Sequence, residues 1–296
     1  MKKSILLFVA FALTVGAYAQ VVVRSTVTSS RKGESISIDK AKYRVTYTGK
    51  MVRDTLNTPY KYIESEMRLD VGDNVTHFYD RTKEIRDSII HDGVMKGNYD
   101  FQNLPKGGGI QWQYYRNYPE QGKSTFLETV LTNDYQCIEA VEIPDWHIQP
   151  DSAATIMGYG CRLAVARFKG RTWYAWYAED LPLSEGPWKL CGLPGLILKA
   201  YDQNRQYVFD GIGLANANGT ADITFDKTAR ETISQKDLRE AKEKMDLTSL
   251  LGNISSSATV KFKNADGSTS TDSKEIQRKL KNVSRNMKQN PIELCQ

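Results

Sequence analysis

The 296-residue sequence contains few of the side chains that most often carry catalysis or bind metals, with only three histidines and four cysteines. His77, His91 and His147 have no second histidine or cysteine pair at ligand spacing, so the sequence predicts no zinc site. It also lacks a nucleophile elbow, a P-loop, a dinucleotide-binding fingerprint and an EF-hand loop. We therefore assign no catalytic residue, no metal and no cofactor from the sequence.

Strong charge and long internal apolar runs are absent too. The formal net charge is only +5, which argues against a nucleic-acid partner. Beyond the N-terminus, no stretch approaches the roughly 20 apolar residues that a membrane span requires. Because 40% of the residues are hydrophobic, the chain can still build a large core, and its length suits one large domain or two small ones, of which we favour one.

The N-terminal segment has the three parts of a secretory signal. A basic start is followed by an apolar run over residues 5–15 and by the Ala-x-Ala site at 17–19. We expect residues 1–19 to be a cleavable signal peptide, in preference to a buried N-terminal helix, and residues 20–296 to be the mature domain. No cysteine follows the site, so the expected location is the periplasm or the outside of the cell, without a lipid anchor.

Alternation of polar and apolar residues predicts a strand-rich fold. In segment 62–71, apolar and charged side chains alternate with period two, which is typical of a strand with one wet face. Helical spacing comes late, after Ser234 and over residues 273–288. The predicted class is α+β: a curved, mainly antiparallel β-sheet with two C-terminal helices packed on it.

Export would permit disulfide bonds. Among the four cysteines, Cys137 and Cys161 are the favoured pair, because both fall on predicted strands around one connecting loop. Cys191 could be a nucleophile, but nothing near it in the sequence supplies a base.

Residues 158–202 are the most unusual stretch. Trp173 and Tyr177 would share one face of a strand, and Tyr174 and Trp176 the other. Further along, the run from Gly192 includes Pro194-Gly195, a pair that suits a type II turn in which Gly195 adopts positive φ. Residues 179–195 therefore look like an ordered connection between two strands.

This stretch resembles the GLPGLI family of exported proteins from the Bacteroidota. The motifs that carry the resemblance are Gly-Tyr-x-Cys at 158–161, Phe-x-Gly-Arg at 168–171, Ala-Trp-Tyr at 175–177, Gly-Pro-Trp-Lys at 186–189, Gly-Leu-Pro-Gly-Leu-Ile at 192–197 and Asn-Pro-Ile-Glu-Leu at 290–294. The resemblance implies export and a β-rich fold, and it brings no catalytic residue with it.

Four large aromatic rings on one strand leave two interpretations. One pair should enter the core, and the other is either covered by Trp188 of the 179–195 connection or lines a binding surface. The binding reading predicts a non-enzymatic envelope protein that takes an apolar or amphipathic ligand or a partner protein. The alternatives are an envelope hydrolase that uses carboxylates near 179–185, and a structural accessory of an outer-membrane transport complex.

Overall fold

The computed structural model describes a large part of the chain. The ranges are 6–11, 20–26, 34–96, 104–105, 109–110, 112–131, 133–244, 259–263, 269–270, 272–286 and 290–294. The expected cleavage site at Ala19 and the thiol of Cys295 lie outside them.

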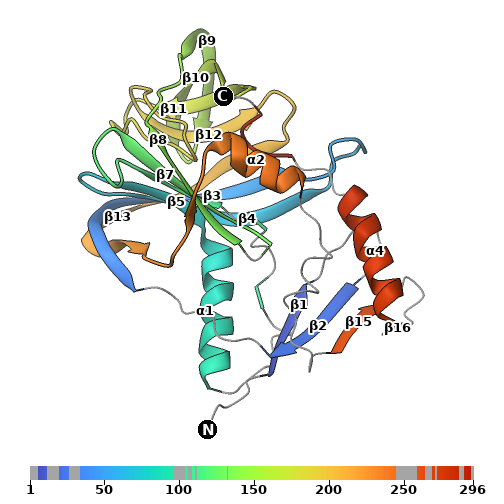
Figure 1. Ribbon diagram of the computed structural model, residues 1–296. Helices are drawn as coiled ribbons and strands as arrows, with labels where there is room; N and C mark the ends of the chain where they lie inside the picture. Colours follow the sequence, from blue (N-terminus) through green and yellow to red (C-terminus); the bar gives the residue numbers. More distant parts are fainter. Residues whose placement is uncertain are drawn as a thin grey trace.

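Most of the described chain is β-sheet, and the larger sheet has twelve strands (Figure 1). Their order across the sheet is β14 (Glu231–Thr232), β8 (Asn133–Ala140), β7 (Lys123–Val130), β6 (Trp112–Arg116), β5 (Thr76–Asp80), β4 (Tyr62–Val71), β3 (Ser35–Val52), β13 (Tyr207–Asp226), β12 (Leu196–Asp202), β11 (Arg171–Ala178), β10 (Tyr159–Phe168) and β9 (His147–Ile156). Neighbouring strands are antiparallel, apart from the parallel β14–β8 pair.

The sheet consists of two meanders, β3 to β8 and β9 to β13, joined where β13 pairs with β3. A smaller sheet contains β1 (Leu6–Phe11), β2 (Gln20–Thr26), β15 (Thr259–Lys263) and β16 (Thr269–Ser270). The helices are α1 (Arg81–Met95), α2 (Gln235–Glu243) and α4 (Ser273–Asn286). α2 packs on the large sheet through Leu238, whereas α4 contacts β15 of the small sheet. Among the described residues, no helix could cross a membrane.

Alternation decides which face of each strand is buried. On β4, Met67 and Leu69 are fully buried while Glu64 and Glu66 point to solvent, as the period-two pattern predicts. One buried row crosses the sheet in register through Val45, Leu69, Phe78, Tyr114, Phe126 and Cys137. These residues belong to the main core, so we call this side the core face and the opposite side the outer face.

Segments outside the sheet cover the core face. Trp188, Leu190 and Leu193 from the 179–195 connection, Leu238 from α2 and Ile292 near the C-terminus all belong to the main core. The space in front of the sheet is therefore filled by the chain itself.

Candidate functional site

The inner aromatic pair of β11 lies in the main core. Trp173 and Tyr177 have no exposed surface, and the Trp173 ring lies 5.3 Å from the ring of Trp188 and 6.5 Å from that of Phe209. Ring contacts of this kind add to the large area that tryptophan buries. The inner pair therefore stabilises the fold and is closed to a ligand.

The connection that carries Trp188 is held by its own hydrogen bonds. Leu196 N–H donates to Leu181 O at 2.9 Å and Ile197 N–H to Glu185 O at 2.9 Å. Trp188 has a φ of 56°, an uncommon backbone conformation for a large side chain. These contacts place its indole on Trp173, so the connection covers the inner pair.

The outer pair remains half-buried. Tyr174 stacks on Tyr201 of β12, with ring centroids 5.3 Å apart and an interplanar angle of 6°, and the Arg205 guanidinium lies 4.3 Å from the Tyr201 centroid. Trp176 pairs with Leu163 of β10 and is also partly exposed. The outer pair thus forms an aromatic surface that includes a cation.

The expected positive φ at Gly195 is wrong. Positive φ occurs instead at Gly192, at 88°. Glycine is required at 195 for another reason: a Cβ there would lie 2.1 Å from the carbonyl oxygen of Ala178. The close approach of two backbone segments, and not a left-handed turn, explains this part of the motif.

We expect Gly195→Ala to lower the free energy of unfolding by about 1–3 kcal/mol, because a backbone atom cannot move aside as a flexible side chain would. Gly160→Ala on β10 is the matched control, since no heavy atom lies within 4 Å of a Cβ built there. Urea denaturation of both variants tests this. Equal midpoints for the two would contradict the close-approach explanation.

The favoured disulfide is wrong as well. Cys137, Cys161 and Cys191 are all buried free thiols. Cys137 lies on β8 and Cys161 on β10, which are second from opposite ends of the twelve-stranded sheet. The two strands are close in sequence, but β8 belongs to the meander β3 to β8 and β10 to the meander β9 to β13. The two cysteines therefore lie in different halves of the sheet.

Arg171, the last residue of the Phe-x-Gly-Arg motif, binds the C-terminal segment 290–294. Its guanidinium is buried and donates to the backbone oxygens of Pro291 and Ile292 at 2.6 and 2.9 Å. It also donates to Asn290 Oδ1 at 2.7 Å and to Asp202 Oδ2 at 2.8 Å. Two motifs that lie more than a hundred residues apart in the sequence therefore meet in one buried cluster.

Lys189 of the Gly-Pro-Trp-Lys motif holds the same segment. Its buried ammonium lies 2.7 Å from Glu293 Oε1 and 2.8 Å from Glu139 Oε2. Sequence reasoning missed both basic residues, although their position inside the motifs was a signal. The motifs thus serve to anchor residues 290–294.

Two of the three carboxylates at 179–185, Glu179 and Glu185, have basic partners. Glu185 forms an ion pair with buried Arg116, and Glu179 lies 3.6 Å from Arg162 Nη1. A hydrolytic pair would require two carboxyl groups that face a common substrate. Nothing in this geometry favours such a pair.

A second polar cluster lies on the outer face of β5 and β6. The His77 ring is stacked between Tyr115, at 3.9 Å, and Tyr79, at 4.4 Å, and its Nε2 lies 2.9 Å from Gln113 Oε1. Burial lowers the pKa of His77 to about 4, although the Gln113 hydrogen bond and the charge of Asp70 oppose this. This histidine therefore stays neutral at physiological pH.

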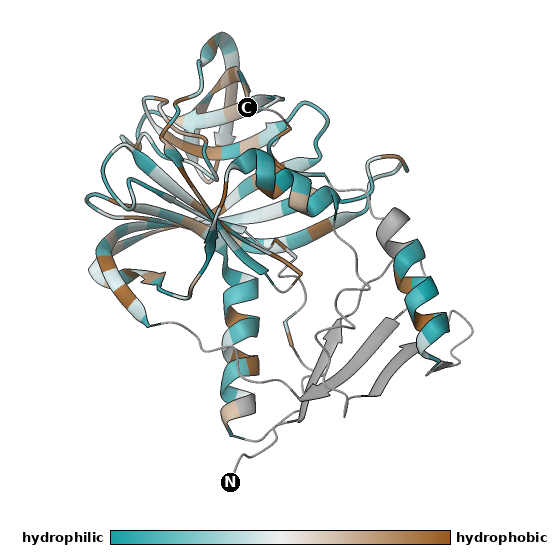
Figure 2. Ribbon diagram, viewed as in Figure 1, coloured by the Kyte–Doolittle hydropathy of each residue, from teal (hydrophilic) through white to brown (hydrophobic). Residues whose placement is uncertain are grey.

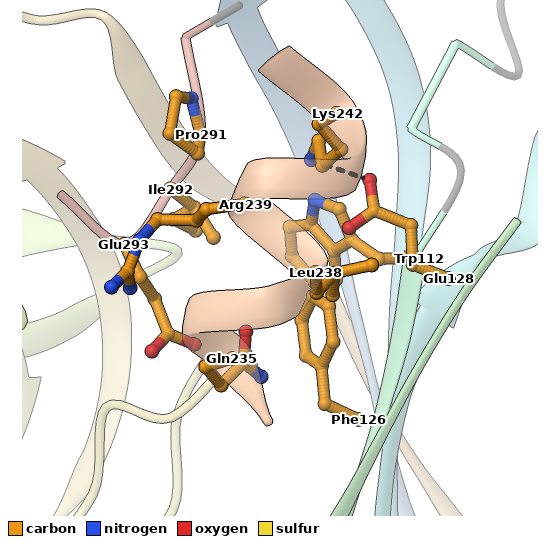
Figure 3. A pocket seen from close by; sticks show the side chains of 10 residues that line it. All are labelled: Trp112, Phe126, Glu128, Gln235, Leu238, Arg239, Lys242, Pro291, Ile292 and Glu293. Atoms are coloured by element: carbon orange, nitrogen blue, oxygen red, sulfur yellow. Dashed lines mark hydrogen bonds and ion pairs between the residues drawn. The ribbon is translucent and has the colours of Figure 1, made fainter. Parts of the chain in front are cut away.

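A small depression of about 20 Å³, room for one or two water molecules, lies between α2, the large sheet and the C-terminal segment (Figure 3). Its lining residues are Trp112, Phe126, Glu128, Gln235, Leu238, Arg239, Lys242, Pro291, Ile292 and Glu293. Within the described part of the chain, no group of three or more His, Cys, Asp or Glu side chains could hold a metal ion.

Comparisons with known proteins give little functional information. No curated protein matches the chain. Two solved structures, titled "Structure of PNGF-II in P21 space group" and "Structure of PNGF-II in C2 space group", have TM-scores of 0.43 and 0.42 and identities of 15% and 14%. The matched region is 68% or 67% of this chain, but only 32% of the length of each of those chains. A family model described as "Protein of unknown function (Porph_ging)" matches residues 128–199, so this part of the chain, which contains β11 and the 179–195 connection, is similar to a family of unknown function.

Proposed function

We propose that the chain is an exported, non-enzymatic protein that binds a partner protein of the cell envelope through the outer face of β10 to β12. This surface, the outer aromatic face, consists of Leu163, Val165, Tyr174, Trp176 and Tyr201. The observation that carries the proposal is that these side chains are partly exposed while the inner pair of the same strand is fully buried.

The core face favours a partner over an enclosed lipid. A carrier that shelters an acyl chain needs a hollow on this side of its sheet. Here Trp188, Leu190, Leu193 and Ile292 occupy that side as part of the main core. Binding on the outer face needs no such hollow.

The composition of the outer aromatic face also suits a protein partner. Tryptophan, tyrosine and arginine are the residues that most often dominate binding energy at protein interfaces. Trp176, Tyr174 and Tyr201 lie together here, and Arg205 stacks on Tyr201. The hydrolase alternative has no comparable support, because Glu179 and Glu185 each lie beside an arginine.

Site-specific photocrosslinking in the native host tests the partner. With the photoreactive residue at position 201, we expect a discrete crosslinked species. The same residue at Glu64, an exposed position on the outer face of β4, is the control and should give none. Identical products from both positions, or no product from 201, would contradict the proposal, and mass spectrometry of the crosslinked band distinguishes a second copy of this chain from an outer-membrane transport component.

Export rests on the signal pattern of residues 1–19. We expect the protein purified from its native host to begin at Gln20. Intact-mass measurement checks this: a chain that retains Met1 would show that the N-terminal segment is not removed.

A further inference from the structure

The strands of the outer aromatic face carry almost no negative charge. β10 and β11 contain no Asp or Glu, and the one carboxylate of β12, Asp202, is buried on the core face, where it binds Arg171. On the outer face Lys199 pairs with Trp176 across the strands, and Asp210 of β13 neutralises this lysine at 2.7 Å. A further cation on β10 to β12 therefore has no carboxylate of these strands to meet.

Two exposed arginines border the stacked tyrosines of this face. Arg205, in the turn between β12 and β13, lies with its guanidinium 4.3 Å from the ring centroid of Tyr201. Arg167 of β10 is two residues beyond Val165, which pairs with Tyr174. A long side chain reaches a diagonal neighbour of this kind on the adjacent strand. The Tyr174–Tyr201 stack thus has one guanidinium group on each side.

Neither guanidinium has an acidic partner within the described part of the chain. Arg162, at the other end of β10, lies 3.6 Å from Glu179, whereas Arg167 and Arg205 form no ion pair there. The contact between Arg205 and the flat face of Tyr201 leaves the donors along the edge of the guanidinium free and restricts their direction. This arrangement suits bidentate binding of a planar carboxylate.

The distance between the arginines limits what can bind both. They lie two to three strand spacings apart, which is about 10–15 Å. An extended segment covers that distance in about three to five residues. Strands β9 to β12 carry both hydrophobic and hydrophilic residues (Figure 2), and the tyrosine rings lie between the two charges. A complementary segment therefore has a carboxylate at each end and apolar residues between them.

We propose that the partner meets the outer aromatic face through an acidic segment. Two of its carboxylates bind Arg167 and Arg205, and the apolar residues between them pack on Tyr174 and Tyr201. This inference rests on the proposed function, because it specifies the chemistry of the partner at the same surface. A lipid surface fits less well, since anionic membranes attract clusters of about four to eight basic residues, and this face offers two unpaired ones.

NMR titration of the mature chain, residues 20–296, tests the charge preference. The probe is the peptide Ac-Glu-Leu-Phe-Leu-Glu-NH₂, and the matched control peptide has Gln at both ends. We expect the acidic peptide to bind about tenfold more tightly, because two exposed ion pairs together are worth about one order of magnitude in affinity. The difference should disappear at high salt. Equal affinity for the two peptides at low salt would overturn the inference.

Substitution of both arginines gives the residue-level test. The double variant Arg167→Gln, Arg205→Gln should lose the preference for the acidic peptide, and thermal unfolding verifies that it is folded. Lys236→Gln, an exposed basic residue on α2, is the control and should keep the preference. An unchanged preference in the folded double variant would overturn the inference, as would binding of phosphatidylglycerol vesicles in place of the acidic peptide.

The result is distinguishable from a failure of the proposed function. A crosslinked protein from position 201, together with equal binding of the two peptides, overturns the acidic segment and leaves the partner-binding surface in place. A preference for the acidic peptide that requires Arg167 and Arg205 supports the inference about charge. If position 201 then gives no crosslinked protein in the native host, the proposed function alone is contradicted.

Discussion

Arg171→Met is expected to lower the free energy of unfolding by about 3–5 kcal/mol. The substitution removes the cation opposite Asp202, whose side chain is 3% exposed, and leaves a buried charge without its partner. It also removes the donors to Asn290, Pro291 and Ile292. Urea denaturation monitored by tryptophan fluorescence measures the loss.

Arg167→Met is the matched control, because Arg167 is an exposed arginine on the neighbouring strand β10. It should change stability by less than about 0.5 kcal/mol. Hydrogen exchange gives a second readout: in Arg171→Met, the amide of Leu294, which donates to Lys169 O in the native protein, should lose protection. A loss of stability below about 1 kcal/mol would show that the Arg171 cluster does not anchor the C-terminal segment.

Because His77 is buried, we expect the free energy of unfolding of the protein to decrease as the pH falls. Its folded pKa is about 4 and its ordinary value is 6.5, so between these values the unfolded chain binds a proton that the folded chain does not. The contribution of neutral, buried His77 to the free energy of unfolding is therefore fully present above pH 6.5, and it is lost as the pH falls toward 4. A shift of this size corresponds to about 3 kcal/mol.

His77→Phe keeps a ring between Tyr79 and Tyr115 but cannot titrate. We expect this variant to lose the part of the pH dependence that lies between pH 6.5 and 4. His147→Gln, which removes an exposed histidine on β9, should keep the wild-type profile. Denaturation at pH 7, 5.5 and 4 measures the difference, and parallel profiles for wild type and His77→Phe would contradict it.

The sequence predicted local features where polar and apolar side chains follow a clear period. The alternation over 62–71 identified β4 and both of its faces. The capping pattern at Ser234 and Asp237 indicated the start of a helix, and the Ser234 side chain accepts the Asp237 N–H at 3.1 Å. These features depend on neighbours within four residues, which is the range that periodicity reports.

Features that depend on distant or unpatterned residues were not predictable. α1 lacks a regular apolar stripe, and Ile89 in it is exposed, so its sequence carries no amphipathic signal. The strand pattern expected over 207–214 is shorter than the 20 residues of β13. The pairing with β3 shifts register between Asn216 and Ala221, where Asn218 and Gly219 adopt positive φ, and it resumes from Ala221 to Asp226. Likewise, spacing along the chain does not show that Arg171 meets Asn290.

The pairing of β3 with β13 determines when this protein can fold. The two partners, residues 35–52 and 207–226, are separated by about half of the chain, and the Arg171 cluster closes only around residues 290–294. Contacts of such long sequence separation are reached slowly, because a large loop has to close before they form. A chain that emerges from the ribosome N-terminus first therefore cannot complete this strand pair until about three-quarters of it has been made. Until the final segment docks, the nascent chain stays short of its native state, which is the condition in which a polypeptide can be threaded through a narrow translocation channel.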